Sequence, residues 1–204
     1  LSDSSGFIYD KDGIDSNKLL WVMDLKNNKR GRIKEYADKF GADYYEGKRP
    51  WGIACDIALP CATQNEIDKD DAFELLKNNC KVVSEGANMP TDPSAVNAFL
   101  DAQILFGPGK AANAGGVATS GLEMSQNSMR LNWSREEVDN RLQEIMINIH
   151  TACINYGTID INGSEGSQLI SGLLIALFSD VSIITNPFGI APVFSSSSES
   201  HFGT

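Results

Sequence analysis

Short apolar segments alternate with helix-like segments along most of the sequence, and this alternation constrains the fold more than any other feature. Segments of strand-like composition lie at residues 55–59, 81–84 and 103–106, with helix-like segments at 68–76 and 92–100 between them. Strands that alternate with helices in this way indicate βαβ units and a parallel sheet. The sequence therefore predicts an α/β fold whose ligands bind beyond the carboxyl ends of the strands.

Local signals for helix starts and stops support the same reading. Asp15 or Ser16 is placed to cap one helix at its amino end, and Gly41 is placed to end another. Ser134 precedes two acidic residues, which is typical of a helix start. The other expected elements are a strand at 7–9 and helices over 31–40, 112–131 and 134–156.

A change of composition divides the chain. No Lys or Arg follows Arg141, and from Thr158 the sequence becomes rich in Ser, Gly and Ile. We expect a boundary near Gly157, with one domain at residues 1–157 and a tail at 158–204 whose structure is not indicated. The apolar stretch 169–184 is shorter than the roughly 20 apolar residues of a membrane-spanning helix and contains polar residues, so we expect no membrane association.

Charge and cysteine spacing exclude several classes of partner. The formal net charge is −10, which argues against a general nucleic-acid surface. The four cysteines form no C-x-x-C pair and only two histidines are present, so we predict no metal site. No signal peptide is visible at the start. We expect reduced thiols in a cytoplasmic protein.

Three polar or glycine-rich clusters follow the predicted strands, at residues 60–65, 85–90 and 108–121. Small and amide-bearing side chains allow a planar ligand to approach the backbone closely. The alternative interpretations are capped turns at the first two clusters and a tight contact between helices at the third. Neither a G-x-G-x-x-G nor a Walker A pattern is present.

A group of basic residues stands out in this acidic sequence. Its members are Lys26, Lys29, Arg30 and Arg32. Such a group is suited to bind a phosphate, because guanidinium and ammonium groups donate charge-assisted hydrogen bonds to its oxygens. A solvated helix face is the alternative interpretation.

The three clusters, taken in order, resemble those of bacterial and fungal NADP-dependent glutamate dehydrogenases, in the glutamate, leucine, phenylalanine and valine dehydrogenase family. The matching segments are 56–65, 85–91 and 107–124, and the shorter segments 2–6 and 31–36 match as well. The resemblance covers residues 1 to about 157, and we expect the tail at 158–204 not to match the family. It implies a Rossmann-like domain, the coenzyme NADP, and the reversible conversion of glutamate to 2-oxoglutarate and ammonia.

The resemblance also implies roles for individual residues. Ala62, Thr63 and Asn65 would line the nicotinamide end of the coenzyme site, with Asn88 nearby. Nicotinamide and substrate would meet at Asn113, Gly116 and Val117, and Ser120 would bind the distal carboxylate of the substrate. For the adenosine end of the coenzyme, the chemistry of the side chains indicates Ser2, Asp3, Ser4, Lys26, Lys29 and Arg32.

The choice between NAD and NADP depends on which part of the coenzyme these six residues contact. An acid at the end of the second Rossmann strand usually holds the ribose hydroxyls of NAD, and Asp3 is a candidate for that role. Ser2 and Ser4, with Lys26, Lys29 and Arg32, suit a 2′-phosphate instead. We expect NADP.

Two departures from the family pattern limit what this chain can do. The family's glycine-rich dinucleotide turn and its substrate domain have no counterpart here, so we expect a Rossmann-like sheet that is incomplete at its N-terminus. The catalytic lysine and aspartate belong to that other domain, and no catalytic residue is assigned in this chain. We therefore expect a fragment that is inactive alone, from a parent enzyme that forms a homo-hexamer. The alternatives are a leucine or phenylalanine dehydrogenase and an inactive nucleotide-binding module.

Overall fold

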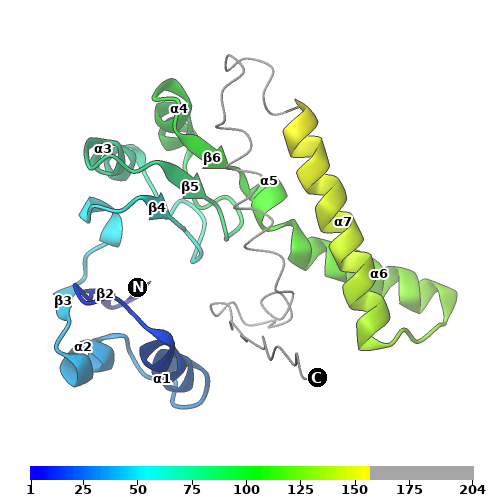
Figure 1. Cartoon of the computed structure of the whole chain (residues 1–204), viewed down its shortest axis with the longest axis horizontal. Coiled ribbons are helices and arrows are strands. Elements are labelled where there is room, and N and C mark those ends of the chain that lie inside the picture. Colours follow the sequence, from blue (N-terminus) through cyan, green and yellow to red (C-terminus); the bar gives the residue numbers. More distant parts are fainter. Residues whose placement is uncertain (157–204) are drawn as a thin grey trace, which may run out of the picture. The chain divides into compact units, whose positions relative to one another are not determined.

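The computed structural model describes residues 1–156, and these residues belong to two compact units (Figure 1). The first unit is Leu1–Asn113, and the second begins at Ala114. The boundary expected near Gly157 falls where the described residues end. The expected tail and its apolar stretch 169–184 lie outside them. Among the described residues, no helix is long and apolar enough to cross a membrane.

The first unit opens with an antiparallel sheet of three strands in the order β1-β2-β3, namely β1 (Ser2–Asp3), β2 (Gly6–Tyr9) and β3 (Asp43–Glu46). Helices α1 (Ser16–Asn27) and α2 (Lys34–Phe40) connect β2 to β3. They bury a cluster against the sheet that comprises Ile8, Val22, Ile33, Tyr36 and Ala37. The predicted strand at 7–9 is confirmed, but its neighbours run antiparallel to it and were not foreseen.

The predicted parallel sheet follows, with strand order β4-β5-β6. Its strands are β4 (Ile57–Ala58), β5 (Val82–Ser84) and β6 (Leu105–Gly107). Helices α3 (Lys69–Lys77) and α4 (Pro93–Asp101) make the two crossovers, contact each other, and lie on the same face of the sheet (Figure 1). The α/β architecture with a parallel sheet and flanking helices is therefore confirmed.

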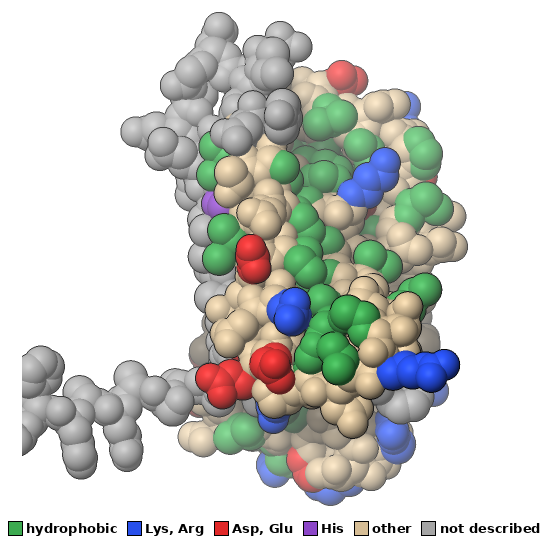
Figure 2. Space-filling view, turned by 90° about the vertical axis from the view of Figure 1, so that its right-hand side faces the viewer, with side chains coloured by type: hydrophobic (Ala, Val, Ile, Leu, Met, Phe, Trp, Pro, Cys, Tyr) green, Lys and Arg blue, Asp and Glu red, His purple; other side chains and the backbone are tan. Residues whose placement is uncertain are grey.

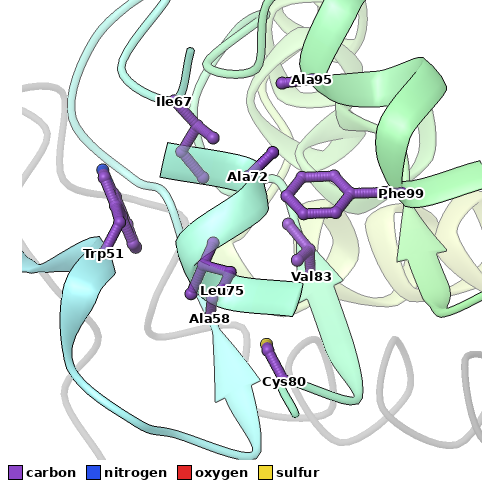
Figure 3. Close-up of a cluster of buried hydrophobic side chains, with 9 residues drawn as sticks. All are labelled: Trp51, Ala58, Ile67, Ala72, Leu75, Cys80, Val83, Ala95 and Phe99. Atoms are coloured by element: carbon purple, nitrogen blue, oxygen red, sulfur yellow. The ribbon is translucent and has the colours of Figure 1, made fainter. Parts of the chain in front are cut away.

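A cluster of buried side chains lies between this sheet and its helices (Figure 3). Phe99 of α4 and Leu75 of α3 are fully buried and meet Val83 from the sheet. Trp51 joins the cluster from the 3₁₀ helix η1 (Pro50–Gly52). The remaining members are Ala58, Ile67, Ala72, Cys80 and Ala95. This core fixes where the strands end, and so it positions the three loops that follow them.

The caps of these helices explain why they start where the sequence predicted. The side chain of Asp68 accepts from the backbone N–H groups of Asp70 and Asp71, in a capping box with Asp71. At α4, the side chain of Asp92 accepts from the N–H of Ala95, 2.7 Å away, and Pro93 occupies the first helical position. At α1, the cap is Asp15 rather than Ser16.

The helix predicted over 112–131 is present as α6 (Ala114–Met129), and a separate short helix that was not predicted precedes it. This short helix, α5 (Gly109–Ala112), ends at Asn113, and α6 begins after it. The second unit then pairs α6 with α7 (Arg135–Tyr156), which starts as predicted at a reciprocal cap between Ser134 and Glu137.

Large apolar side chains reach the surface as well as the core (Figure 2). The most exposed of them, Val117 at 79% and Met124 at 72%, lie on α6. Since Glu123 is the only charged residue of α6, this helix presents an exposed surface that is almost uncharged and carries Val117, Met124 and Met129. Such a surface is suited to contact with a ligand or with another segment of protein.

Candidate functional site

The loops after β4 and β5 are bonded to each other at the carboxyl edge of the parallel sheet. The carbonyl oxygen of Pro60 accepts from the N–H groups of Gly86 and Ala87, at 3.0 and 3.1 Å. Farther along, the N–H of Asn65 donates to the carbonyl oxygen of Met89, 3.0 Å away. Two of the predicted clusters therefore form one continuous surface.

Glu85 connects the loop after β5 to the loop after β6. Its backbone N–H donates to the carbonyl oxygen of Gly107 at 2.9 Å, and its carboxylate Oε2 accepts from the N–H of Gly109 at 2.6 Å. The side-chain amide of Asn113 also donates to the carbonyl oxygen of Ala87. Glu85 is only 6% exposed, so its carboxylate joins the two loops from below the surface.

Two glycines allow these close approaches. A Cβ at Gly86 would lie 2.4 Å from the Sγ of Cys61, and a Cβ at Gly109 would lie 3.2 Å from both Glu85 Oε2 and the carbonyl oxygen of Ala87. Side chains at these positions would push the loops apart. Glycine at these positions therefore allows the loops to pack closely, whatever they bind.

Left-handed backbone shapes the rim of this edge. Asn65 and Met89 have φ angles of 53° and 51°, although neither is glycine. Asparagine tolerates this conformation, whereas it is uncommon for methionine. Strained backbone of this kind is often found at ligand sites, where the surrounding structure holds it in place. Here the hydrogen bond between the two residues holds it.

The residues predicted for the nicotinamide end lie along these loops. Ala62, Thr63, Asn65 and Asn88 are all exposed, and Asn113 is half-buried. The structure thus brings the first two predicted clusters together with residues 108–113 of the third, and it leaves four of these five residues accessible. Sequence reasoning missed Glu85, although an acid directly after an apolar strand is a usable signal.

A second cluster forms around the carboxylate of Asp3. Lys26 Nζ lies 2.6 Å from its Oδ2, which also accepts from the N–H of Ile33 at 2.9 Å, and its Oδ1 accepts from the N–H of Ser5 at 2.9 Å. Beside it, the guanidinium of Arg32 donates to the hydroxyl of Ser4 at 2.6 Å. Four of the six residues predicted for the adenosine end therefore form one cluster.

Asp3 is held as an anion by this cluster. Burial opposes its ionisation, but the Lys26 ammonium and the N–H groups of Ile33 and Ser5 outweigh that cost and lower the pKa of the carboxyl group. Its oxygens already accept from three donors of the protein itself, which are Lys26 Nζ and the N–H groups of Ile33 and Ser5. Asp3 thus acts in this structure as an internal anchor for Lys26 and for the segment between α1 and α2.

The other two predicted residues take different positions. Lys29 pairs with Asp24, 2.7 Å away, and lies over the ring of Trp21 with its Nζ 5.9 Å from the ring centroid. Ser2 is exposed in β1. The basic group found in the sequence is therefore divided between the Asp3 cluster and the surface of α1.

The residues predicted to contact the substrate belong to the second unit. Val117 and Ser120 are exposed on the first half of α6, and Gly116 before them has open space at its Cβ position. The hydroxyl of Thr119 instead donates to the carbonyl oxygen of Gly115, 2.9 Å away. Among residues 1–156, no group of three or more His, Cys, Asp or Glu side chains is placed to hold a metal ion.

The sequence matches the model of the glutamate/leucine/phenylalanine/valine dehydrogenase family over residues 1–182. The chain belongs to this family. The match confirms the resemblance stated from the loop motifs, and its range extends past residue 157. The part beyond 156 lies outside the described structure.

Individual relatives within this family are close. The NADP-specific glutamate dehydrogenase of Haemophilus influenzae is 58% identical over 177 residues, and the NAD(P)-specific enzyme of Xylanibacter ruminicola is 64% identical over 178 residues. These matches cover 87% and 86% of this chain. They cover only 39% and 40% of the relatives, so the chain spans about two fifths of their length.

A solved structure supports the fold. The crystal structure of Plasmodium falciparum glutamate dehydrogenase is similar with a TM-score of 0.68 and 46% sequence identity. The match covers 86% of this chain and 38% of that one. Sequence and structure thus agree on the family, and the relatives differ among themselves in coenzyme.

Proposed function

We propose that this chain supplies the coenzyme-binding part of an NADP-dependent glutamate dehydrogenase of the cytoplasm. The complete enzyme would reversibly convert L-glutamate, NADP and water to 2-oxoglutarate, ammonia and NADPH. The observation that carries the proposal is the surface formed by three bonded loops at the carboxyl edge of a parallel sheet. Ligands of open α/β sheets bind at this edge.

The exposed residues of that edge fit the nicotinamide end of a dinucleotide. The amides of Asn65 and Asn88 offer donors and acceptors together, and Ala62 and Thr63 leave room for a planar ring. Asn113 orders the loop through Ala87 and borders the same edge. The bound coenzyme would accept or donate the hydride, while these residues bind and orient it.

We assign the adenosine 2′-phosphate to the cluster around Asp3. Arg32 and Ser4 are exposed and adjacent, so both can turn from each other to a phosphate. Lys26 would contribute positive charge from its anchored position, with Ser2 and Lys29 at the margin. An Asp3 that is already bound by protein donors favours NADP over NAD, because the ribose hydroxyls of NAD lose their usual acceptor.

Coenzyme preference in a chimeric enzyme tests this assignment. Residues 1–182 would replace the matching region of the Haemophilus influenzae relative, which supplies the rest of the family's length. Removing both Lys26 and Arg32 by alanine substitution should cost roughly 2–3 kcal/mol of NADP binding, which is tens- to hundred-fold in kcat/KM, with little change for NAD. The control is Lys34→Ala, because Lys34 is exposed and pairs with Asp38. An unchanged ratio of NADP to NAD activity in the double variant would refute the assignment.

Substrate contact and assembly complete the proposal. Ser120 would donate to the distal carboxylate of glutamate, with Val117 beside it, and the catalytic groups would come from the substrate domain of the complete enzyme. The domain would comprise residues 1–157, and the parent would be a homo-hexamer. The isolated chain would then bind coenzyme without turnover, because proton transfer needs a positioned acid or base. Glutamate oxidation by residues 1–204 alone would contradict this.

The alternatives give different results in the same chimera. A leucine or phenylalanine dehydrogenase would prefer the apolar amino acid to glutamate, and its Ser120 would have no carboxylate to bind. An inactive nucleotide-binding module would bind NADPH and leave the chimera inactive with every amino acid.

A further inference from the structure

The end of α3 fixes Cys80 at the start of β5. The N–H of Asn79 donates to the carbonyl oxygen of Leu76, and the N–H of Cys80 donates to that of Leu75, both at 3.0 Å. Asn79 has a φ of 59°, which completes a Schellman motif after the helix. Cys80 is only 3% exposed, and its side chain points into the core beneath the sheet (Figure 3). Its position is therefore determined by the backbone on both sides.

Cys55 precedes the neighbouring strand β4, as Cys80 precedes β5. The parallel register pairs Ile57 with Val82, and Cys55 and Cys80 each stand two residues before these partners. The carbonyl oxygen of Asp56 accepts from the N–H of Val82 at 3.1 Å, which continues the pairing toward the two cysteines. The Sγ of Cys80 also lies 3.8 Å from that same carbonyl oxygen.

Facing positions on paired strands suit a disulfide. Paired strands lie about 4.7–4.9 Å apart, and bridged cysteines have Cα atoms about 4.4–6.8 Å apart. Cys55 packs against the cluster that contains Cys80, and after burial the Cys80 thiol is the neighbour that contributes most to the raised pKa of Cys55. No large backbone movement is therefore needed to join them.

We propose that Cys55 and Cys80 form an oxidisable pair that closes to an intrachain disulfide when hydrogen peroxide reaches Cys55. Cys55 is half-buried and Cys80 is buried, so Cys55 is the sulfur that a small oxidant meets first. Its thiolate attacks one peroxide oxygen, which gives a sulfenic acid at Cys55 and water after proton transfer. The thiolate of Cys80 then attacks the Cys55 sulfur and displaces hydroxide, which takes up a proton. Two thiols and one peroxide thus give one disulfide and two waters.

The environment of the two thiols makes this pair slow to react with peroxide and favours the disulfide over further oxidation. Burial and the neighbouring Cys80 raise the pKa of the Cys55 thiol to about 11, so little thiolate is present at neutral pH. The pair stays reduced until peroxide persists, and the facing thiol then captures the sulfenic acid before it is oxidised further. The bond braces the amino ends of β4 and β5, at the other end of the strands from the proposed coenzyme loops, and the inference does not depend on that function.

The test follows the thiols of the whole 204-residue chain. Cys55 and Cys61 lie between Arg49 and Lys69 without a Lys or Arg between them, so trypsin leaves both on one peptide. The starting variant is therefore Cys61→Ser with Cys153→Ser, which retains only the proposed pair. Folded protein is treated with peroxide, quenched, denatured and titrated for thiols. We expect the count to fall from two to zero, with a peptide cross-linked between Cys55 and Cys80 that is recovered only without reductant.

A matched variant separates the pair from ordinary thiol oxidation. Adding Cys80→Ala leaves Cys55 without its partner, so peroxide should carry it to sulfinic acid and no cross-linked peptide should form. The urea midpoint of the oxidised starting variant should rise and return with dithiothreitol, whereas the Cys80→Ala variant should show no such reversible rise. Two thiols that survive peroxide, a cross-link between chains, or a cross-link formed only after denaturation would each overturn the proposal.

Discussion

Replacing Glu85 by alanine should loosen the junction between two loops of the candidate site. The Glu85 carboxylate is buried and accepts from the N–H of Gly109 at 2.6 Å, and Gly109 is itself buried. Hydrogen bonds to charged groups contribute about 1.5–3 kcal/mol, and an N–H left without a partner retains its desolvation cost. Removing a buried carboxylate recovers part of this, since the charge no longer has to be desolvated. We therefore expect a net loss of about 2 kcal/mol.

The glutamine variant separates charge from hydrogen bonding. Glu85→Gln keeps an oxygen that can accept from Gly109, so the bond becomes a neutral one worth about 0.5–1.5 kcal/mol. Its loss of stability should be about half that of the alanine variant. The control is Glu74→Ala, since Glu74 is an exposed residue of α3 that pairs with the neighbouring Lys77, and surface substitutions change stability by about 0.5 kcal/mol or less.

Urea unfolding followed by tryptophan fluorescence measures these differences. Trp51 packs in the core of the parallel sheet and reports its unfolding. With a urea dependence of about 1–3 kcal/mol per molar, a loss of 2 kcal/mol moves the midpoint down by about 1 M. If Glu85→Ala unfolds at the same urea concentration as Glu74→Ala, the carboxylate does not hold the two loops together, and the argument from its short contact with Gly109 is wrong.

Three further predictions concern the anchor, the substrate and the core. The pKa of Asp3 is lowered from 3.8, so the stability that its carboxylate contributes is fully present above that pH and is lost as pH falls through the lower pKa of the folded state. Asp3→Asn should therefore remove this acid-dependent loss of stability, as measured by urea midpoints from pH 5 down to pH 2. In the chimeric enzyme, Ser120→Val should raise the KM for glutamate at least tenfold, which is a loss of about 1.4 kcal/mol or more in substrate binding, and leave the KM for the coenzyme within about twofold. Equal effects on both KM values would indicate general damage to the fold. Phe99→Ala should lower the free energy of unfolding by about 3–5 kcal/mol, because Phe99 is fully buried, whereas Leu100→Ala, at a residue that is 55% exposed, should cost far less by the same urea assay.

Signals confined to one segment predicted most of the fold. The caps at Asp15, Asp68 and Asp92 each lie within three residues of the N–H groups that they bind, so sequence alone locates them. The parallel strands were recognisable because they are apolar runs between helices. Strand β3 (Asp43–Glu46) was missed because its sequence, Asp-Tyr-Tyr-Glu, is stabilised by pairing with β2, more than 30 residues earlier. The sequence of the segment itself therefore does not indicate this pairing.

The short helix α5, which ends at Asn113 before α6 begins, illustrates the same limit. Residues 109–121 consist mainly of Ala and Gly, and nothing in that composition marks an end to the helix. In the structure, the side-chain amide of Asn113 donates to the carbonyl oxygen of Ala87, which belongs to the loop of another strand. The break therefore results from a tertiary hydrogen bond, and only the folded loops reveal it.

The Asp3 cluster shows why residue types identified the candidate site but not its internal arrangement. Composition singled out the basic residues because they are unusual in an acidic chain, and it left Asp3 open as a ribose ligand. The arrangement depends on the segment between α1 and α2, where Arg30 adopts a φ of 55° and the N–H of Ile33 turns toward Asp3. That turn places the backbone N–H and Lys26 on one carboxylate oxygen and leaves Arg32 at the surface beside Ser4. An acid in this position is thus compatible with a phosphate site, because its charge is already compensated within the protein and does not repel the ligand as an unpaired carboxylate would.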